Sequence, residues 1–173
     1  MAIGAGDNDT ALVGRARQGD KEAFEALYLR YRDRIFRLCV NLGADREEAA
    51  DLLQETFINA WKGLPKFAGR AAFSTWLHRI AVNACRQALR RRKIDPPPPQ
   101  RSAGDPASIV AVRAVIASLR PNHRTVLALR YGEGLSYREI AESLDWPLGR
   151  VKATLHRARQ AFKEEFCDSA GEK

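Results

Sequence analysis

The clearest supersecondary signal in the chain lies at Ser136–Leu155, which reads SYREIAESLDWPLGRVKATL. Ser136, with Glu139 three residues later, forms a capping box, so a helix is expected to begin there. The Asp-Trp pair after this helix makes a tight connection, and Pro147 suits the first turn of a second helix. Two helices joined by about three residues match a helix-turn-helix. We expect five apolar residues of this pair to turn inward: Ile140, Ala141, Leu144, Val151 and Leu155.

Outward from this motif, the sequence predicts two earlier helices and then a break. The helices cover Ser108–Leu119 and Pro121 to about Tyr131. Before them, Ile94–Ser108 reads IDPPPPQRSAGDPAS and holds five of the eight prolines. Consecutive prolines forbid a helix and favour an extended spacer. We therefore expect two domains, at residues 9–93 and 108–168, joined by a proline-rich linker at 94–107.

The N-terminal domain also carries helical signals. Asp9 or Thr10 is suited to cap a first helix ending near Gln18–Asp20, and Asp20 to cap a second. The second helix has an apolar stripe at helical spacing. Its members are Phe24, Leu27, Tyr28, Tyr31, Ile35 and Leu38.

Two more helices are expected before the linker. Gly43 ends the second helix, and Asp45 with Glu48 resembles a capping box that opens the third. Gly63–Arg70, GLPKFAGR, breaks that helix, and a fourth runs from Phe73 to the basic end RRRK. No alternating strand pattern competes. The fold class is therefore predicted to be all-α, with a helical bundle followed by a helix-turn-helix domain.

Charge is distributed unevenly along the chain. The formal net charge is +8 and the isoelectric point is near 9.8, which favours a polyanionic partner such as nucleic acid but is also compatible with a role in solubility. No acidic residue lies between Glu55 and Asp95. A solvated helix face would explain the run at Arg90–Lys93, but it does not predict the lack of acids over forty positions. The nine cations of this segment are Lys62, Lys66, Arg70, Arg79, Arg86, Arg90, Arg91, Arg92 and Lys93.

Several kinds of site are not expected. The three cysteines and three histidines are scattered, without the spacing of a disulfide framework or a metal site, so we predict neither metal nor cofactor. The N-terminus lacks a signal peptide, and no run approaches the roughly twenty apolar residues needed to span a bilayer. We therefore expect a cytoplasmic protein without membrane insertion.

Phe73–Asn83, FSTWLHRIAVN, allows two interpretations. Its aromatic residues at helical spacing are typical of a core helix. The basic, glycine- and proline-broken loop before it instead favours a surface for single-stranded bases, which bind through stacking and a basic track. In the last helix, the lack of acids between Trp146 and Lys163 favours DNA binding. There Arg157 and Arg159 are either phosphate contacts or partners of nearby glutamates.

Three segments together resemble bacterial RNA polymerase sigma factors of the extracytoplasmic-function (ECF) group, which contain the second and fourth conserved sigma regions. The segments are RARQGDKEAFEALYLRYRDRIFRL, DLLQETFINAWKGLPKFAGRAAFSTWLHRIAVNACRQ and LRPNHRTVLALRYGEGLSYREIAESLDWPLGRVKATLHRARQ. They are in the family's order and cover nearly everything except the termini and the linker. The resemblance implies a factor that binds core RNA polymerase and directs promoter-specific initiation, without a catalytic site of its own.

The resemblance also implies residue roles in the first domain. DLLQETF would dock on the clamp helices of the polymerase, through Asp51, Gln54, Glu55 and Phe57. The loop and helix from Lys66 to Asn83 would hold the melted minus-ten element of promoter DNA, with a pocket for a flipped-out base. The implied minus-ten contacts are Lys66, Phe67, Arg70, Trp76, Arg79 and Asn83. Relatives often read FRG where this chain has Ala68.

In the second domain, the last helix would read the minus-thirty-five element, and the domain would meet the polymerase flap. The implied contacts are Arg130, Arg150, Lys152, Ala153, His156 and Arg157. Where relatives commonly read GTVKSRL, this chain reads GRVKATL, so the promoter sequence of relatives does not transfer. The resemblance further implies an anti-sigma partner. Two alternatives stay open: a helix-turn-helix regulator that acts without polymerase, and a nucleic-acid enzyme, against which stands the lack of an Asp/Glu/His constellation or Gly-rich phosphate loop.

Overall fold

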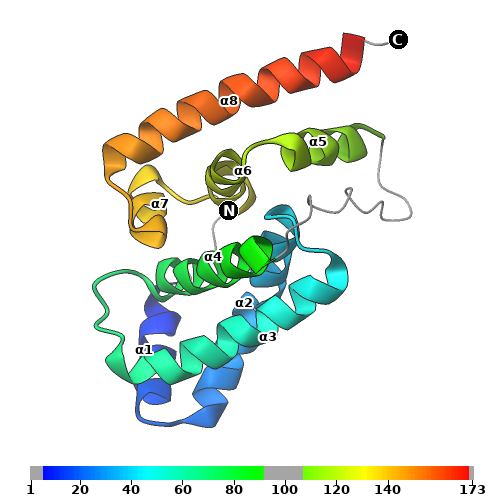
Figure 1. Cartoon of the computed structure of the whole chain (residues 1–173). Helices are drawn as coiled ribbons and strands as arrows, with labels where there is room; N and C mark the ends of the chain where they lie inside the picture. The colour runs from blue at the N-terminus through cyan, green and yellow to red at the C-terminus, as the bar shows by residue number, and fades with distance from the viewer. Residues whose placement is uncertain (1–5, 92–106, 172–173) are drawn as a thin grey trace.

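The computed structural model describes residues 6–91 and 107–171, and within these residues the chain is helical and contains no strand. Figure 1 shows two layers, with α1–α4 in one and α5–α8 in the other. The first layer consists of α1 (Gly6–Arg17), α2 (Lys21–Asn41), α3 (Arg46–Gly63), the 3-10 turn η1 (Leu64–Lys66) and α4 (Phe73–Arg91). The second consists of α5 (Ala107–Ser118), α6 (Pro121–Leu127), the π-helical turn η2 (Ala128–Gly132), α7 (Tyr137–Leu144) and α8 (Leu148–Gly171). The all-α prediction is confirmed.

Local capping sets the helix starts in the first layer. The Asp20 side chain accepts a hydrogen bond from the Ala23 amide at 3.0 Å, and Asp45 accepts one from the Glu48 amide at 2.8 Å. Gly43 comes after α2 with a φ of +107°, a left-handed conformation that glycine adopts without strain. The predicted starts of α2 and α3 and the end of α2 are therefore confirmed.

The predicted cap of the first helix is wrong. α1 already begins at Gly6, so Asp9 and Thr10 lie inside it. The Asp9 carboxylate is buried and accepts hydrogen bonds from the Tyr31 hydroxyl and the Arg30 guanidinium of α2. Asp9 thus joins two helices, because a buried carboxylate is stable only with such partners.

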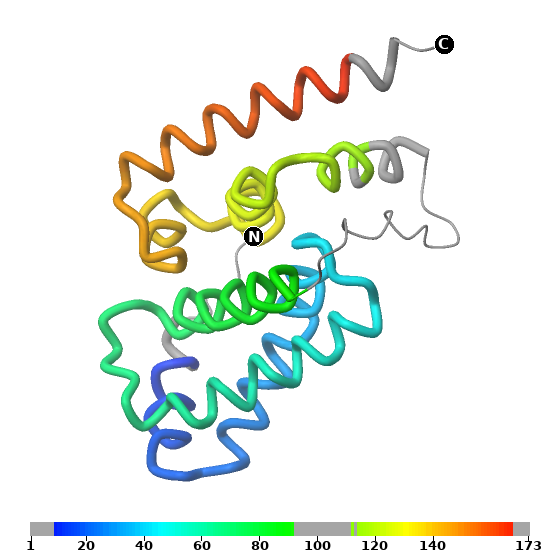
Figure 2. The backbone as a smooth tube through the Cα atoms, viewed as in Figure 1, coloured from blue at the N-terminus to red at the C-terminus, as the bar shows by residue number. Residues whose placement is uncertain are grey.

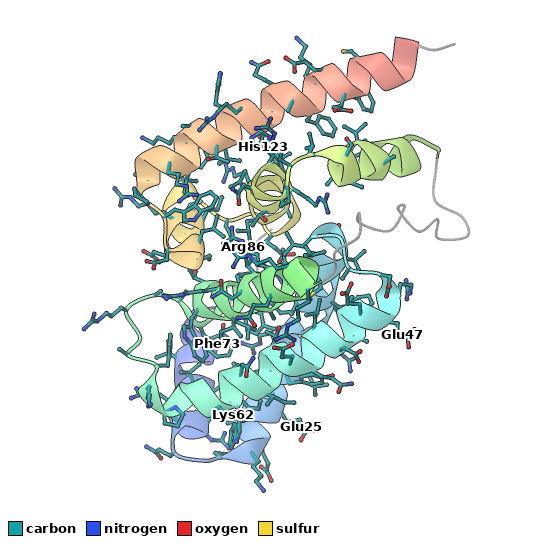
Figure 3. All side chains as sticks on the ribbon, viewed as in Figure 1. Glu25, Glu47, Lys62, Phe73, Arg86 and His123 are labelled. Carbon is teal, nitrogen blue, oxygen red and sulfur yellow. The ribbon has the colours of Figure 1, made fainter. Side chains whose placement is uncertain are left out.

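The core of the first layer lies where α2 meets α4. Leu27 and Ile35 of α2 and Leu77 and Val82 of α4 are fully buried. Burial of each such side chain contributes about 1.5–3 kcal/mol. Figure 3 shows Phe73 pointing into this core, while Glu25, Glu47 and Lys62 lie on the outer surface.

The helix-turn-helix forms as the sequence predicts. The Ser136 hydroxyl accepts from the Glu139 amide at 3.3 Å, and the Glu139 carboxylate accepts from the Ser136 amide at 2.7 Å. Asp145 closes α7 in a left-handed conformation with φ 54°. Four of the five expected apolar residues are buried; Ala141 is only half-buried, because it lies at the edge of the face that α7 turns inward.

The two layers pack directly on each other. In Figure 2, α7 lies against α4, on the side of α4 that faces away from α3. Fully buried residues therefore occur on both sides of α4: Leu77 and Ala81 belong to the apolar core, and His78 is buried at the boundary between the layers. α4, the helix with the two competing interpretations, is central to the whole fold.

Candidate nucleic-acid interface

The loop before α4 and the exposed face of α4 bring most of the predicted minus-ten residues to the surface. Lys66, Arg70, Arg79 and Asn83 are exposed, and Trp76 is half-buried. Phe67 differs, since its side chain is only 8% exposed. The exposed cations and the amide of Asn83 form a surface suited to an anionic strand, whereas Phe67 offers little contact area in this conformation.

Three aromatic rings support this surface from below. The centroid of Trp76 lies 4.8 Å from that of Phe67 and 5.8 Å from that of Phe73. Trp76 also packs closely on Gly63, where an added Cβ would meet the indole ring at 3.1 Å. The indole is thus fixed by the loop while part of its surface stays accessible. The helix is therefore a core helix, through Phe73, with an exposed polar face.

The start of α8 presents the predicted minus-thirty-five residues. Val151 and Leu155 point inward, and as a result five of the predicted contacts lie at the surface: Arg150, Lys152, Ala153, His156 and Arg157. Arg157 donates from Nε to the Ala153 carbonyl at 3.3 Å. This exposed, acid-free face is suited to a DNA groove.

Arg130, the sixth predicted contact, is less free. It is half-buried, donates to the Leu135 carbonyl at 2.8 Å, and lies 5.3 Å from the centroid of the Tyr137 ring. These contacts brace the chain that leads into α7. Arg130 as a phosphate contact stays a prediction.

The face of α3 predicted to bind polymerase is only partly as expected. Asp51, Gln54 and Glu55 are exposed. Phe57 is 4% exposed and packs edge-on against Tyr28 at 4.9 Å, so it belongs to the core in this structure. Its neighbour Ile58 is 52% exposed and was missed by the sequence analysis. The spacing of Ile58 three and four residues after Glu55 and Gln54 was the available signal.

An apolar pocket of about 500 Å³ opens in the second layer, next to the end of α2. Tyr131, which is 64% exposed, stands at its edge together with Asn41 and Arg159. No sequence pattern predicts this pocket, because its walls come from separate helices. The apolar lining consists of Val112, Ile116, Leu127, Ala128 and Phe162.

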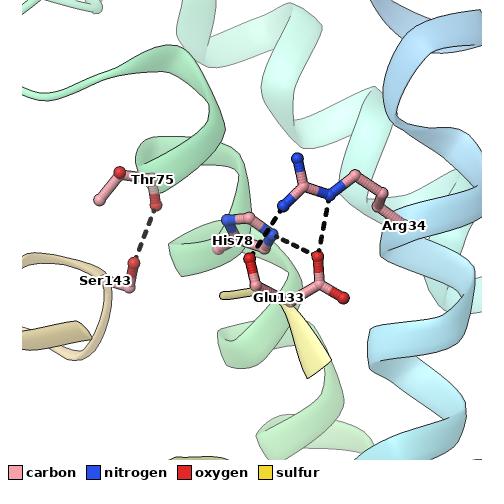
Figure 4. A network of polar contacts seen from close by, with 5 residues as sticks. All are labelled: Arg34, Thr75, His78, Glu133 and Ser143. Carbon is pink, nitrogen blue, oxygen red and sulfur yellow. Dashed lines mark hydrogen bonds and ion pairs between the residues drawn. The ribbon is translucent and has the colours of Figure 1, made fainter. Parts of the chain in front are cut away.

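A buried polar cluster joins the two layers (Figure 4). Glu133, from the second layer, accepts from Arg34 Nε at 3.1 Å and lies 3.3 Å from His78 Nε2. Burial by itself would raise the pKa of Glu133, but the hydrogen bond from His78 and the charges of His78 and Arg34 outweigh it, so the pKa lies below its usual value. No sequence pattern links residues this far apart.

A second contact that the sequence did not predict joins Cys39 of α2 to Cys85 of α4. Both residues are buried. The hydrogen bond between their thiols, together with burial, raises the pKa of Cys85 well above its usual range. A thiol with a raised pKa is a poor nucleophile, which favours a structural role for the pair.

The chain matches two family models in the order that the sequence analysis expects. Residues 27–94 match sigma-70 region 2, and residues 109–162 match sigma-70 region 4. The RNA polymerase sigma-H factor of Pseudomonas aeruginosa is 36% identical, over 90% of this chain and 92% of its own length. The ECF RNA polymerase sigma-E factor of Haemophilus influenzae is 34% identical, over 91% of this chain and 95% of its own. The chain belongs to the ECF RNA polymerase sigma factors.

Two solved structures share the fold of this chain. CnrH, solved in complex with the cytosolic domain of CnrY, is 26% identical with a TM-score of 0.75, covering 91% of this chain and 96% of that one. The sigma factor RpoE of Bartonella quintana, solved with the anti-sigma factor NepR, shares the fold with a TM-score of 0.73 at 20% identity, covering 82% of this chain and 95% of that one. The protein is thus a transcription initiation factor. None of its described helices has the length and apolar character needed to cross a membrane.

Proposed function

We propose that this sigma factor binds core RNA polymerase through region 2 and region 4 and directs it to promoters by reading a minus-ten and a minus-thirty-five element. The observation that carries the proposal is the pair of exposed, acid-free basic surfaces, one on α4 and its preceding loop and one on the first turns of α8. Each lies on a different domain, as two separate DNA elements require. The proposed domains are residues 9–93 and 108–168, and of the linker proposed at 94–107 all but the last residue lie outside the part of the chain that the structure describes.

Polymerase would be held at two places. The exposed face of α3, with Asp51, Gln54, Glu55 and Ile58, would meet the clamp helices. Ile58 supplies the apolar anchor that such an interface needs at its centre. The apolar pocket beside Tyr131 would take the flap, since a pocket of about 500 Å³ matches a small group of apolar side chains.

The minus-ten element would be read as a single strand on α4. Taking a base out of the stack costs a few kcal/mol. Stacking on an aromatic surface returns about 1–3 kcal/mol per base, and the accessible part of Trp76 provides such a surface. Asn83 would add hydrogen bonds to a base, while Lys66, Arg70 and Arg79 would neutralise phosphates. The buried Phe67 would support Trp76 and come into direct contact only if the loop moves.

The minus-thirty-five element would be read by the first turns of α8 in a major groove. Arg150, Lys152 and Ala153 lie at that end, with His156 and Arg157 one turn further. Arginine is the side chain most suited to a bidentate contact with guanine. Arg130, from η2, would add a contact to a DNA phosphate.

The factor would act in the cytoplasm, without a catalytic site or cofactor of its own, because initiation requires positioning and melting of DNA by this subunit but no bond cleavage. Control by an anti-sigma factor is part of the proposal. It is supported by RpoE of Bartonella quintana, whose fold this chain shares and which was solved with an anti-sigma factor.

The first test is reconstitution with bacterial core RNA polymerase. Purified protein is mixed with core enzyme, bound complexes are isolated, and transcripts initiated on a genomic DNA library are sequenced. We expect stable binding and a shared pair of promoter elements upstream of the start sites. Binding to duplex DNA without binding to active core polymerase would contradict the proposal and favour a helix-turn-helix regulator that acts alone.

A further inference from the structure

The carboxylate of Glu133 lies where the two sigma regions meet, and its hydrogen-bond partners are in place only when the regions are packed together. The Glu133 side chain, from region 4, is 2% exposed. Its carboxylate accepts from Arg34 of α2 and contacts His78 of α4, and its main-chain carbonyl accepts from Arg34 Nη2 at 3.1 Å (Figure 4). His78 is itself fully buried. These three residues are called the Glu133 cluster below.

Further polar contacts cross the same boundary. The Ser143 hydroxyl of α7 donates to the Thr75 carbonyl of α4 at 3.2 Å. The Arg124 guanidinium of α6 donates to the Leu42 carbonyl, at the end of α2, at 3.2 Å. α4 and α7 are also in direct contact at this boundary. The boundary is therefore a specific interface and not a loose encounter of two surfaces.

Burial makes the Glu133 cluster selective for one arrangement. A buried charge that loses its partner is strongly unfavourable, whereas the same charge in water is well solvated. If the regions shift by even a few ångströms without separating, Glu133 and His78 lose their partners but stay out of water. The interface is thus stable when fully closed or when fully open, and not in between.

The closed arrangement is too small for the proposed task. A compact chain of 173 residues has a radius of gyration of about 16 Å and a diameter of about 40 Å. Promoter elements centred near positions minus ten and minus thirty-five are about 25 base pairs apart, or roughly 85 Å at about 3.4 Å per base pair. Residues 92–106 allow a separation of up to about 50 Å between the two regions once they part.

We propose that the Glu133 cluster is an intramolecular latch, which holds the free sigma factor in a closed form unable to contact both promoter elements and which opens when polymerase binds. That the closed form cannot contact both promoter elements rests on the proposed function. That the two regions are held together rests on the contacts alone.

Like charges at the same boundary make the latch reversible. The centroid of the Trp146 ring, in region 4, lies 5.4 Å from the guanidinium carbon of Arg86 and 3.9 Å from that of Arg150. Burial, together with nearby Arg90 and Arg150, lowers the pKa of Arg86, as expected where cations gather without an acid. Figure 3 shows Arg86 at the boundary between the layers. Opening exposes Arg86 to water and separates it from Arg150, which partly offsets the loss of the Glu133 contacts and of the contact between Arg86 and Trp146.

The test measures the distance between the regions by single-molecule fluorescence energy transfer in the free, full-length protein. Dyes are placed on cysteines introduced at the exposed positions Glu47 and Lys163, in a Cys167→Ser background; Cys39 and Cys85 are buried and stay unlabelled. We expect one high-transfer population for the otherwise unchanged protein. Glu133→Gln should raise the ratio of open to closed molecules at least tenfold.

Two further variants make the result specific. Glu142→Gln changes the charge in the same way on the exposed side of α7 and should keep the closed population. Arg34→Gln breaks the latch from region 2, where the side chain is 37% exposed, and should open the protein as Glu133→Gln does. Helical content by circular dichroism must stay unchanged in all three. A low-transfer population in the unaltered protein, or no shift in either latch variant, would overturn the proposal.

A binding measurement separates the latch from the proposed function. If only the open form binds core polymerase, apparent affinity scales with the open fraction while that fraction is small. Glu133→Gln should then bind core enzyme more tightly by the factor by which it raises the open ratio. Opening without a gain in affinity would refute gating by the latch. Absence of polymerase binding in every variant would refute the proposed function instead, and leave the distance result standing.

Discussion

Arg150 is stacked on Trp146, with its guanidinium carbon 3.9 Å from the centroid of the indole ring. Trp146 belongs to the turn of the helix-turn-helix and Arg150 to the first turn of α8, so the turn itself positions a proposed DNA contact. A cation–π contact of this kind contributes about 0.5–1 kcal/mol at an exposed site. Because the side chain is already ordered, it loses less freedom on binding.

Replacing Arg150 with alanine should weaken binding to the minus-thirty-five duplex by about 5- to 150-fold, corresponding to the 1–3 kcal/mol of a bidentate base contact. Trp146→Leu should produce a smaller loss, because Arg150 remains but is no longer held. Fluorescence anisotropy with the duplex identified by transcript sequencing gives both values. Lys163→Ala removes the same charge from the exposed far part of α8 and is the control; an equal loss there would reduce Arg150 to a general electrostatic role.

For Lys152→Ala, the salt dependence of binding is the informative measurement. If Lys152 neutralises one phosphate, the slope of log affinity against log salt concentration should become shallower by about one unit. Affinity should fall by a similar factor for all DNA sequences. An unchanged slope would remove Lys152 from the contacts.

Asn83→Ala should impair formation of the open promoter complex, since the amide is proposed to bind a flipped base. Asn83 is exposed, so folding and binding to core polymerase should be unaffected. Permanganate footprinting of promoter DNA measures melting, and Gln87→Ala, which removes an exposed amide one turn along α4, serves as the matched control. Loss of polymerase binding in Asn83→Ala would show that the residue is structural.

Substitutions at Ile58 and Phe57 should have different effects, the first on the affinity for core polymerase and the second on folding stability. Ile58→Ser should reduce affinity for core polymerase at least tenfold with little change in melting temperature, because the side chain is already 52% exposed. Phe57→Ala should instead cost about 3–5 kcal/mol of folding stability, the usual value for a buried phenylalanine. Asn59→Ser, a substitution at the neighbouring exposed position, is the matched control for Ile58→Ser. The reverse pattern would restore Phe57 as the polymerase contact.

Acid should open the latch. The pKa of Glu133 is lowered in the closed form relative to its usual 4.5. Ionised Glu133 therefore stabilises the closed form above that pH, and this stabilisation is lost as the pH falls through the lower pKa of the closed form. Between pH 7 and pH 3, energy transfer in the unaltered protein should fall in that acidic range. Other carboxylates titrate there as well, so the informative quantity is the difference from Glu133→Gln. Identical curves for the two proteins would contradict the assignment.

Local features of this fold are readable from sequence, and long-range ones are not. Asp20, Asp45 and Ser136 cap helices through residues three positions away, so their patterns were sufficient. The prediction for Asp9 was wrong, because its carboxylate accepts a hydrogen bond from Tyr31 of another helix, and this contact outweighs the local preference of aspartate for a capping position. Phe57 and Ile58 are both apolar neighbours, and only the packing against Tyr28 determines which one is buried.

The resemblance to sigma factors identified the candidate surfaces, yet it did not indicate how the two regions meet. The Glu133 cluster joins α2 and α4 to a segment more than fifty residues further along the chain. Its members are ordinary polar residues without characteristic spacing. The contact between Cys39 and Cys85 escaped notice for the same reason, since it depends on the relative rotation of α2 and α4.

The π-helical turn at Ala128–Gly132 gives this arrangement an unexpected sensitivity to chain length. Within it, the Glu133 amide bonds to the Ala128 carbonyl five residues earlier, at 3.1 Å, where an α-helix would use four. Such a turn amounts to one inserted residue in a helix. Deleting a single residue from this turn would rotate Glu133 about the helix axis by about 100°, one step of a 3.6-residue helix. Evolution could therefore retune the closure of this sigma factor by a one-codon insertion or deletion, with Arg34, His78 and Glu133 all retained.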